Sequence, residues 1–277
     1  MDNELVLVLF TLFGQASVGL MAADQVASRK TRLAGSNVLP WVLGGMGVAL
    51  AIAFCHLGSP LTAYRAVVNV GTSWLSREVL FAGLFLAMVG ICYRWQRRGV
   101  QRKLMRRIRW AAVFIGALCI FSMACVYTNS AVPAWETYYT HIAFYSTAVI
   151  FGCALHVALS WREHGNQGLQ LVPVVLIACA VVMQLVGVVP YLMVLASGPP
   201  AAQQSLRFLA RLWPVLACSQ LLALGGLGAM VGFWQTYRQK PLQVANRWLY
   251  GALLAFVLAT GTGRALFYAC GVLPTGQ

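Results

Sequence analysis

The residues best suited to chemistry lie between Cys55 and Glu78, a stretch that holds His56, Arg65 and Arg77 as well. This stretch joins two long apolar segments. Ionisable groups close to a membrane interior are costly, and they commonly mark functional sites. A histidine can donate or accept a hydrogen bond and can take up a proton near neutral pH. The cluster therefore predicts proton or electron chemistry at the surface of a bilayer.

A carrier of two electrons and two protons, such as a quinol, suits these residue types. Its site requires an apolar slot, a partner for a ring hydroxyl and a base with a route to water. We expect His56 to hold a ring oxygen and Glu78 to accept and relay the second proton. Gly58 and Pro60 predict a tight bend that lets the backbone approach the ring.

The composition indicates an integral membrane protein. Of 277 residues, 60% are hydrophobic and only 9% are charged, and the mean hydropathy is +0.74. Soluble domains carry about 25% charged residues. The apolar runs are about 20 residues long, which favours helices over barrel strands. The formal net charge of +14 fits basic cytoplasmic loops, so nucleic acid is not an expected partner.

Eight apolar segments predict the fold, an all-α integral membrane protein with one transmembrane domain over residues 1–277. Short connections favour a bundle of antiparallel neighbours. The first residues are acidic, unlike the start of a signal peptide, so we expect the first span to be retained. The eight spans are Leu5–Ala23, Val38–Cys55, Val79–Tyr93, Trp110–Tyr127, Ile142–Trp161, Leu169–Leu195, Leu212–Phe233 and Trp248–Cys270.

Basic residues in the loops predict the orientation of the bundle. Most of the 20 Lys and Arg residues fall in the first, third, fifth and seventh connections. Loops that carry Lys and Arg stay in the cytoplasm, so both termini are expected on the non-cytoplasmic side. The densest loop, Arg94–Arg109, is interpreted as a topology anchor with affinity for anionic lipid. Docking of an acidic partner is its alternative.

This orientation brings further polar residues to the side of the membrane that holds the His56 stretch. They are Tyr127, His141 and Arg264. Two structural alternatives stay open. Glu78 could form an ion pair with Arg65, Arg77 or Arg264, and Arg264 could extend toward lipid headgroups. His156 and His164 give no functional signal in the sequence.

Metal chemistry has weak support in the sequence. The eight Cys residues form no C-x-x-C pair and fall mostly in apolar runs, as small buried residues do. Iron–sulphur and zinc sites require clustered ligands, so we expect no metal and no disulfide. A b-type haem usually takes two histidines at one depth, and His56 and His141 are the one such pair. A haem-bearing cytochrome b subunit remains an alternative.

Several motifs carry a family resemblance. They are T-L-F-G-Q (11–15), H-L-G-S-P-L-T-A-Y-R (56–65), N-V-G-T-S-W-L-S-R-E (69–78), V-Y-T-N-S-A-V-P-A-W (126–135) and G-R-A-L-F-Y (263–268). The most specific part is H-L-G-S-P followed about twenty residues later by L-S-x-E. Nearly end to end, the chain resembles the membrane anchor subunit family of dimethyl sulfoxide reductase.

The resemblance implies a function. Such anchors lie in the bacterial inner membrane as eight helices with periplasmic ends. They oxidise menaquinol without haem or metal, and they pass electrons to an iron–sulphur subunit that serves a molybdopterin catalytic subunit. The quinol-site His and Glu of the family correspond to His56 and Glu78, and its nearby Gly, Ser and Arg to Gly58, Ser59 and Arg65.

Position on the same side adds Tyr127 and Arg264 as expected quinol contacts. An anchor for a polysulfide, thiosulfate or selenate enzyme fits the sequence equally well. A transporter fits poorly, because transporters place ionisable groups near the midplane, which is nearly free of charge here.

Overall fold

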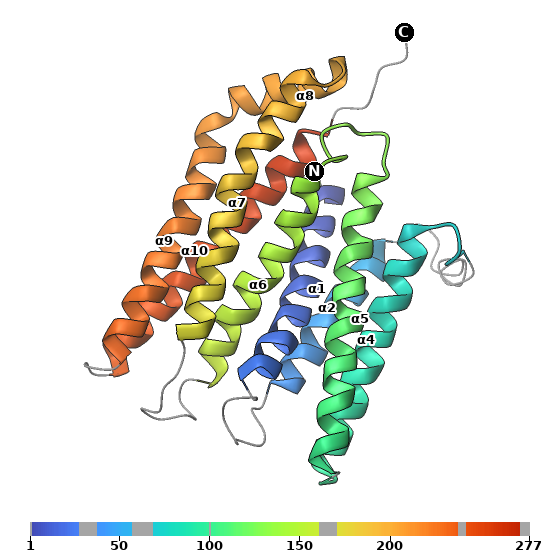
Figure 1. Cartoon of the computed structure of the whole chain (residues 1–277), viewed down its shortest axis with the longest axis vertical. Helices are drawn as coiled ribbons and strands as arrows, with labels where there is room; N and C mark the ends of the chain where they lie inside the picture. The colour runs from blue at the N-terminus through green and yellow to red at the C-terminus, as the bar shows by residue number, and fades with distance from the viewer. Residues whose placement is uncertain are drawn as a thin grey trace. The chain divides into compact units, whose positions relative to one another are not determined.

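The computed structural model of the chain describes residues 2–27, 38–56, 69–99, 101–160, 171–237 and 242–271. Within these ranges the protein is helical and contains no strand (Figure 1), which confirms the predicted all-α class. The nine described helices are α1 (Asp2–Ala27), α2 (Leu39–His56), α4 (Trp74–Arg97), α5 (Arg102–Thr128), α6 (Tyr138–Ser160), α7 (Leu171–Ser197), α8 (Pro200–Arg211), α9 (Trp213–Tyr237) and α10 (Leu242–Ala269).

Seven of the described helices are long and apolar enough to cross a membrane. The apolar part of α2, Leu39–Cys55, is shorter. These eight helices correspond in order to the eight apolar segments in the sequence, and the protein is a multi-pass membrane protein. The Arg-rich loop predicted between α4 and α5 is largely helical instead. Arg is a good helix former, so α5 begins two turns before Trp110, at Arg102.

Helix α8 is a feature that the apolar pattern of the sequence did not reveal. It begins at Pro200, where a missing N–H costs nothing. Its buried residues, Ala201, Ala202, Ser205 and Leu209, recur at helical spacing. Its other face carries exposed residues, including Arg207 and Arg211. The polar composition resembles that of a loop, which explains why no helix was expected here.

The chain divides into two units. Unit 1 comprises Met1–Val126 and Phe151–Gly165, and unit 2 comprises Tyr127–Ile150 and Asn166–Gln277. In unit 1, α1 packs on α2 and α2 packs on α4. In unit 2, α9 packs extensively on α10, and α7 packs on α8 and α9. Helix α6 supplies its first half to unit 2 and its second half to unit 1.

Glycines allow α1 and α6 to approach closely within unit 1. A Cβ atom added to Gly152 would lie 2.1 Å from the carbonyl carbon of Gly19. No side chain fits in that space, so this crossing depends on glycine. Asp24 on α1 and His156 on α6 follow the crossing by about one turn, which brings their side chains together.

Candidate functional site

Glu78 lies in the second turn of α4, inside a candidate membrane span. Ser73 begins this helix by accepting a hydrogen bond from the Ser76 backbone N–H at 3.4 Å. Glu78 is only 4% exposed. The Cys119 thiol on α5 donates to the Glu78 backbone carbonyl oxygen at 3.8 Å, which fixes α4 against α5 at this level. A carboxyl group is thus buried within unit 1.

Arg77 stabilises the turn that precedes α4. Its Nε donates to the Val70 carbonyl oxygen and its Nη2 to that of Gly71, each at 2.8 Å. Its guanidinium also lies 4.2 Å from the centre of the Trp74 ring. Among the described residues the ion pairs are those of Asp24, so the suggested pairing of Arg77 with Glu78 is not formed.

The rest of the predicted site falls largely outside the described residues. His56 is the last residue of α2, as expected from the sequence, and its side chain is not described. Gly58, Ser59 and Arg65 lie in the segment 57–68, outside the described ranges. A pairing of Glu78 with Arg65 lies outside them as well.

Tyr127 and Arg264 lie together in an aromatic cluster of unit 2. The Tyr127 hydroxyl is 2.9 Å from the Tyr268 hydroxyl, and the Tyr127 ring centre is 5.6 Å from that of Phe144. Arg264, 4% exposed, places its guanidinium 3.7 Å from the centre of the same Phe144 ring, a cation–π contact. Because Arg264 is buried, it does not extend toward headgroups.

Trp135, in the segment before α6, packs against the end of α10 and hydrogen-bonds to it. Its indole Nε1 donates to the Phe267 carbonyl oxygen at 2.7 Å, and its ring stacks on the Phe267 ring with centres 5.6 Å apart. A Cβ atom on Gly271 would lie 2.4 Å from the Trp135 ring. The expected site residues on α5 and α10 are therefore held in a well-packed setting.

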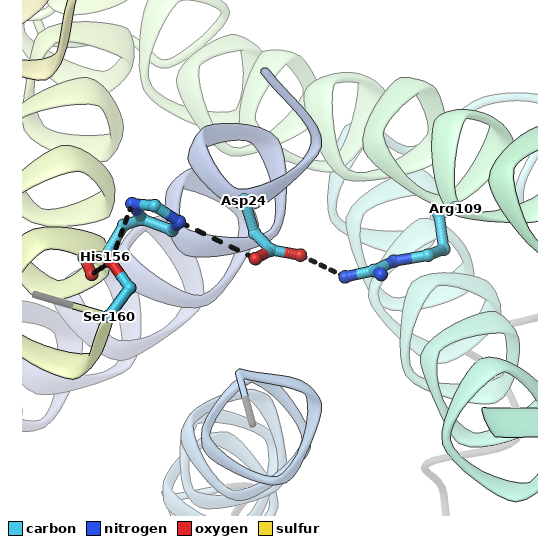
Figure 2. Close-up of polar contacts among 4 residues, drawn as sticks. All are labelled: Asp24, Arg109, His156 and Ser160. Atoms are coloured by element: carbon cyan, nitrogen blue, oxygen red, sulfur yellow. Dashed lines mark hydrogen bonds and ion pairs between the residues drawn. The ribbon is translucent and has the colours of Figure 1, made fainter. Parts of the chain in front are cut away.

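A buried cluster of ionisable side chains, which the sequence did not predict, lies in unit 1. Figure 2 shows the Asp24 carboxylate between Arg109 and His156. One oxygen, Oδ2, pairs with the Arg109 guanidinium, and Oδ1 lies 3.6 Å from His156 Nε2. Ser160 donates to the His156 carbonyl oxygen at 2.6 Å, and its Oγ lies 3.5 Å from His156 Nδ1.

This group is almost fully enclosed. Asp24 is 2% exposed and His156 3%. The signal in the sequence was an aspartate at the end of an apolar run. The predicted first span ends at Ala23 and leaves Asp24 in a loop, and the predicted fourth span begins at Trp110 and leaves Arg109 in another. Both helices extend further, so the two charges meet inside the helical region.

Comparison with known proteins decides the family. The sequence profile of the family described as DMSO reductase anchor subunit (DmsC) matches residues 1–270. The chain belongs to this family. It is 30% identical to the anaerobic dimethyl sulfoxide reductase protein YnfH of Escherichia coli K12, over 96% of this sequence and 94% of that protein.

Two further members of the family are similar over shorter stretches. Both are the C subunit of an anaerobic dimethyl sulfoxide reductase. Identity to the E. coli K12 subunit is 29%, over 67% of this sequence and 68% of that one. Identity to the Haemophilus influenzae subunit is 28%, over 56% and 58%. The resemblance inferred from the motifs is confirmed.

In the part of the protein that the structure describes, no three His, Cys, Asp or Glu residues gather as metal ligands would.

Proposed function

We propose that the protein is the menaquinol-oxidising anchor of an anaerobic dimethyl sulfoxide reductase complex in the bacterial inner membrane. Family membership over residues 1–270 supports the anchor role. Relatives named as parts of anaerobic dimethyl sulfoxide reductase support the terminal substrate. In this proposal eight helices cross the membrane as one domain, with both termini on the non-cytoplasmic side.

The buried carboxyl group of Glu78 carries the proposal. It lies near the start of a span of an anchor-family protein, is 4% exposed, and belongs to neither of the ion pairs found among the described residues. A carboxyl group without a structural ion pair is costly at such a position. Proton transfer to and from a reacting hydroxyl is a role that gives it a purpose.

The proposed reaction follows from these groups. Menaquinol enters from the bilayer and binds beside His56 and Glu78, with Gly58, Ser59 and Arg65 forming the wall of the site. Tyr127 and Arg264 remain predicted quinol contacts that lie near each other in unit 2, and they are not assigned to this wall. Oxidation of one quinol to the quinone releases two electrons and two protons. The protons leave through Glu78 or His56 to the non-cytoplasmic side.

The electrons leave one at a time to an iron–sulphur subunit. That subunit delivers them to a molybdopterin subunit, where the oxide is reduced. The anchor itself does not act on the terminal substrate, and its own substrate is the quinol.

The test separates quinol oxidation from terminal reduction. The complex is prepared with His56→Arg or Glu78→Gln, and dimethyl sulfoxide reduction is driven either by menaquinol or by a reduced viologen dye. We expect menaquinol-driven turnover to be lost and viologen-driven turnover to remain. Normal menaquinol-driven turnover in both variants would refute the assignment.

A further inference from the structure

A pocket in unit 2 is formed by side chains of α6, α7, α8, α9 and α10. The described residues that line it belong to unit 2. Its empty volume is about 840 Å³, part of which is open to the surroundings. None of the described residues of the Cys55–Glu78 stretch is among its lining residues.

The walls of the pocket are mainly apolar, and two stacked aromatic rings belong to its lining. Tyr139 and Tyr191 stack with ring centres 4.9 Å apart and planes at 23°, and both line the pocket. Gly187 lets α7 approach this stack, because a Cβ atom there would lie 3.0 Å from the Tyr139 ring. Aromatic and apolar walls of this kind suit an aromatic ring with an apolar tail.

Two polar groups of opposite hydrogen-bonding character reach the pocket. The Arg264 guanidinium offers N–H donors and no acceptor. Gln220 Oε1 is a buried acceptor, and it has no hydrogen-bond partner among the described residues. A buried acceptor without a donor is costly, so a ligand that supplies one is favoured.

We infer that this pocket binds a para-hydroquinone. One ring hydroxyl donates to Gln220 Oε1, a ring oxygen accepts from Arg264, and the remaining ligand surface meets apolar walls. The inference rests on the proposed function only in that the ligand is a quinol. The oxidised quinone has oxygens that accept but no hydroxyl that donates, so the pocket prefers the reduced form.

Substitutions at two glycines of α10 provide a matched test. Gly263 lines the pocket and Gly261 does not. A Cβ atom at either position would meet nothing within 4 Å. Gly263→Leu therefore fills the pocket, whereas Gly261→Leu adds the same side chain to the same helix outside its lining. Gln220→Met removes the acceptor at similar size.

The experiment uses the purified complex in detergent without oxygen. The probe is 2,3-dimethyl-1,4-naphthoquinone, applied as the quinone and as its hydroquinone, and bound probe per complex is measured by equilibrium dialysis. We expect the Gly263→Leu complex to bind one hydroquinone fewer than the wild-type complex. The Gly261→Leu complex should bind as many as the wild type. Gln220→Met should weaken hydroquinone binding about tenfold and leave quinone binding nearly unchanged.

Several outcomes would overturn the inference. One is wild-type hydroquinone binding in both Gly263→Leu and Gln220→Met. Another is a bound phospholipid, quantified by mass spectrometry, that the hydroquinone does not displace from the wild-type complex. The same phospholipid would be absent from the Gly263→Leu complex. If Gly263→Leu fails to assemble, Gln220→Met alone decides.

The outcome is separable from that of the proposed function. In the same dialysis experiment, the Glu78→Gln complex should still bind the hydroquinone that the Gly263→Leu complex does not bind. Normal menaquinol-driven turnover in both His56→Arg and Glu78→Gln would refute the proposed site and leave this pocket standing. Unchanged binding in Gln220→Met and Gly263→Leu would refute the pocket and leave the proposed site standing.

Discussion

The Asp24 carboxylate pairs with the Arg109 guanidinium across 85 positions of the sequence, joining α1 to α5. The other carboxylate oxygen faces His156 on α6. Three helices of unit 1 are thus linked through one buried acid. Both partners of the ion pair are largely enclosed, with side-chain exposures of 11% for Arg109 and 3% for Asp24. Loss of the acid alone leaves a buried cation.

Asp24→Leu should destabilise the protein strongly. Removing one partner of a buried ion pair costs about 3–5 kcal/mol, because the remaining charge is left uncompensated. Thermal unfolding of the detergent-solubilised protein should show a clearly lowered midpoint. The double variant Asp24→Leu/Arg109→Leu should recover part of the loss, since it leaves no buried charge. Additive losses in the two single variants and the double variant would disprove a coupled pair.

Gly152→Ala should separate α1 from α6. The added methyl group would meet the Gly19 backbone, which is less free to move aside than the end of a flexible side chain. Overpacking of this kind costs about 1–3 kcal/mol. Gly90→Ala on α4 is the matched control, because a Cβ atom there meets nothing within 4 Å. Equal thermal stability of the two variants would show that the close crossing is not required.

Arg77→Met should loosen the turn before α4 without removing a reacting group. Two hydrogen bonds to the carbonyl oxygens of Val70 and Gly71 are lost. We expect a stability loss of about 1 kcal/mol, since the side chain is partly exposed. Menaquinol-driven turnover should fall several-fold and remain measurable. Complete loss of turnover, with viologen-driven reduction intact, would instead indicate that Arg77 contacts the quinol.

Glu78→Asp should retain part of the activity that Glu78→Gln loses. Aspartate preserves the ionisable group and moves it back by one methylene, whereas glutamine keeps the length and cannot relay a proton. The comparison measures menaquinol-driven turnover in complexes of equal subunit content. If Glu78→Gln were the more active variant, length and not proton transfer would define the role of Glu78.

The sequence predicted the helices well because their apolar runs are long, and length alone distinguishes a span from a loop. Helix ends were less predictable. Arg102 to Arg109 extend α5, and their charge made this stretch resemble a connection. Helix α8 was missed because most residues of its buried face, such as Ala201 and Ser205, are small and give little apolar signal.

For the candidate site, residue type singled out Glu78, which stays a prediction, and motif order identified the family. Pairwise contacts were not predictable from one sequence. Nothing in the order of residues shows that Arg77 bonds to the backbone at Val70, or that Tyr127 meets Tyr268. The pocket beside Gln220 depends on five helices packing together, and no local pattern reports such packing.

The division of α6 between the units has a consequence for synthesis at the ribosome. The first 126 residues of unit 1 emerge before residues 151–165, which complete it. Until then Gly19 lacks the helix that crosses it, and Asp24 lacks His156. The helices of residues 1–126 therefore lack part of their packing contacts until residues 151–165 have been synthesised. A nascent polypeptide stalled before Phe151 should be more accessible to membrane proteases than one released after Ser160.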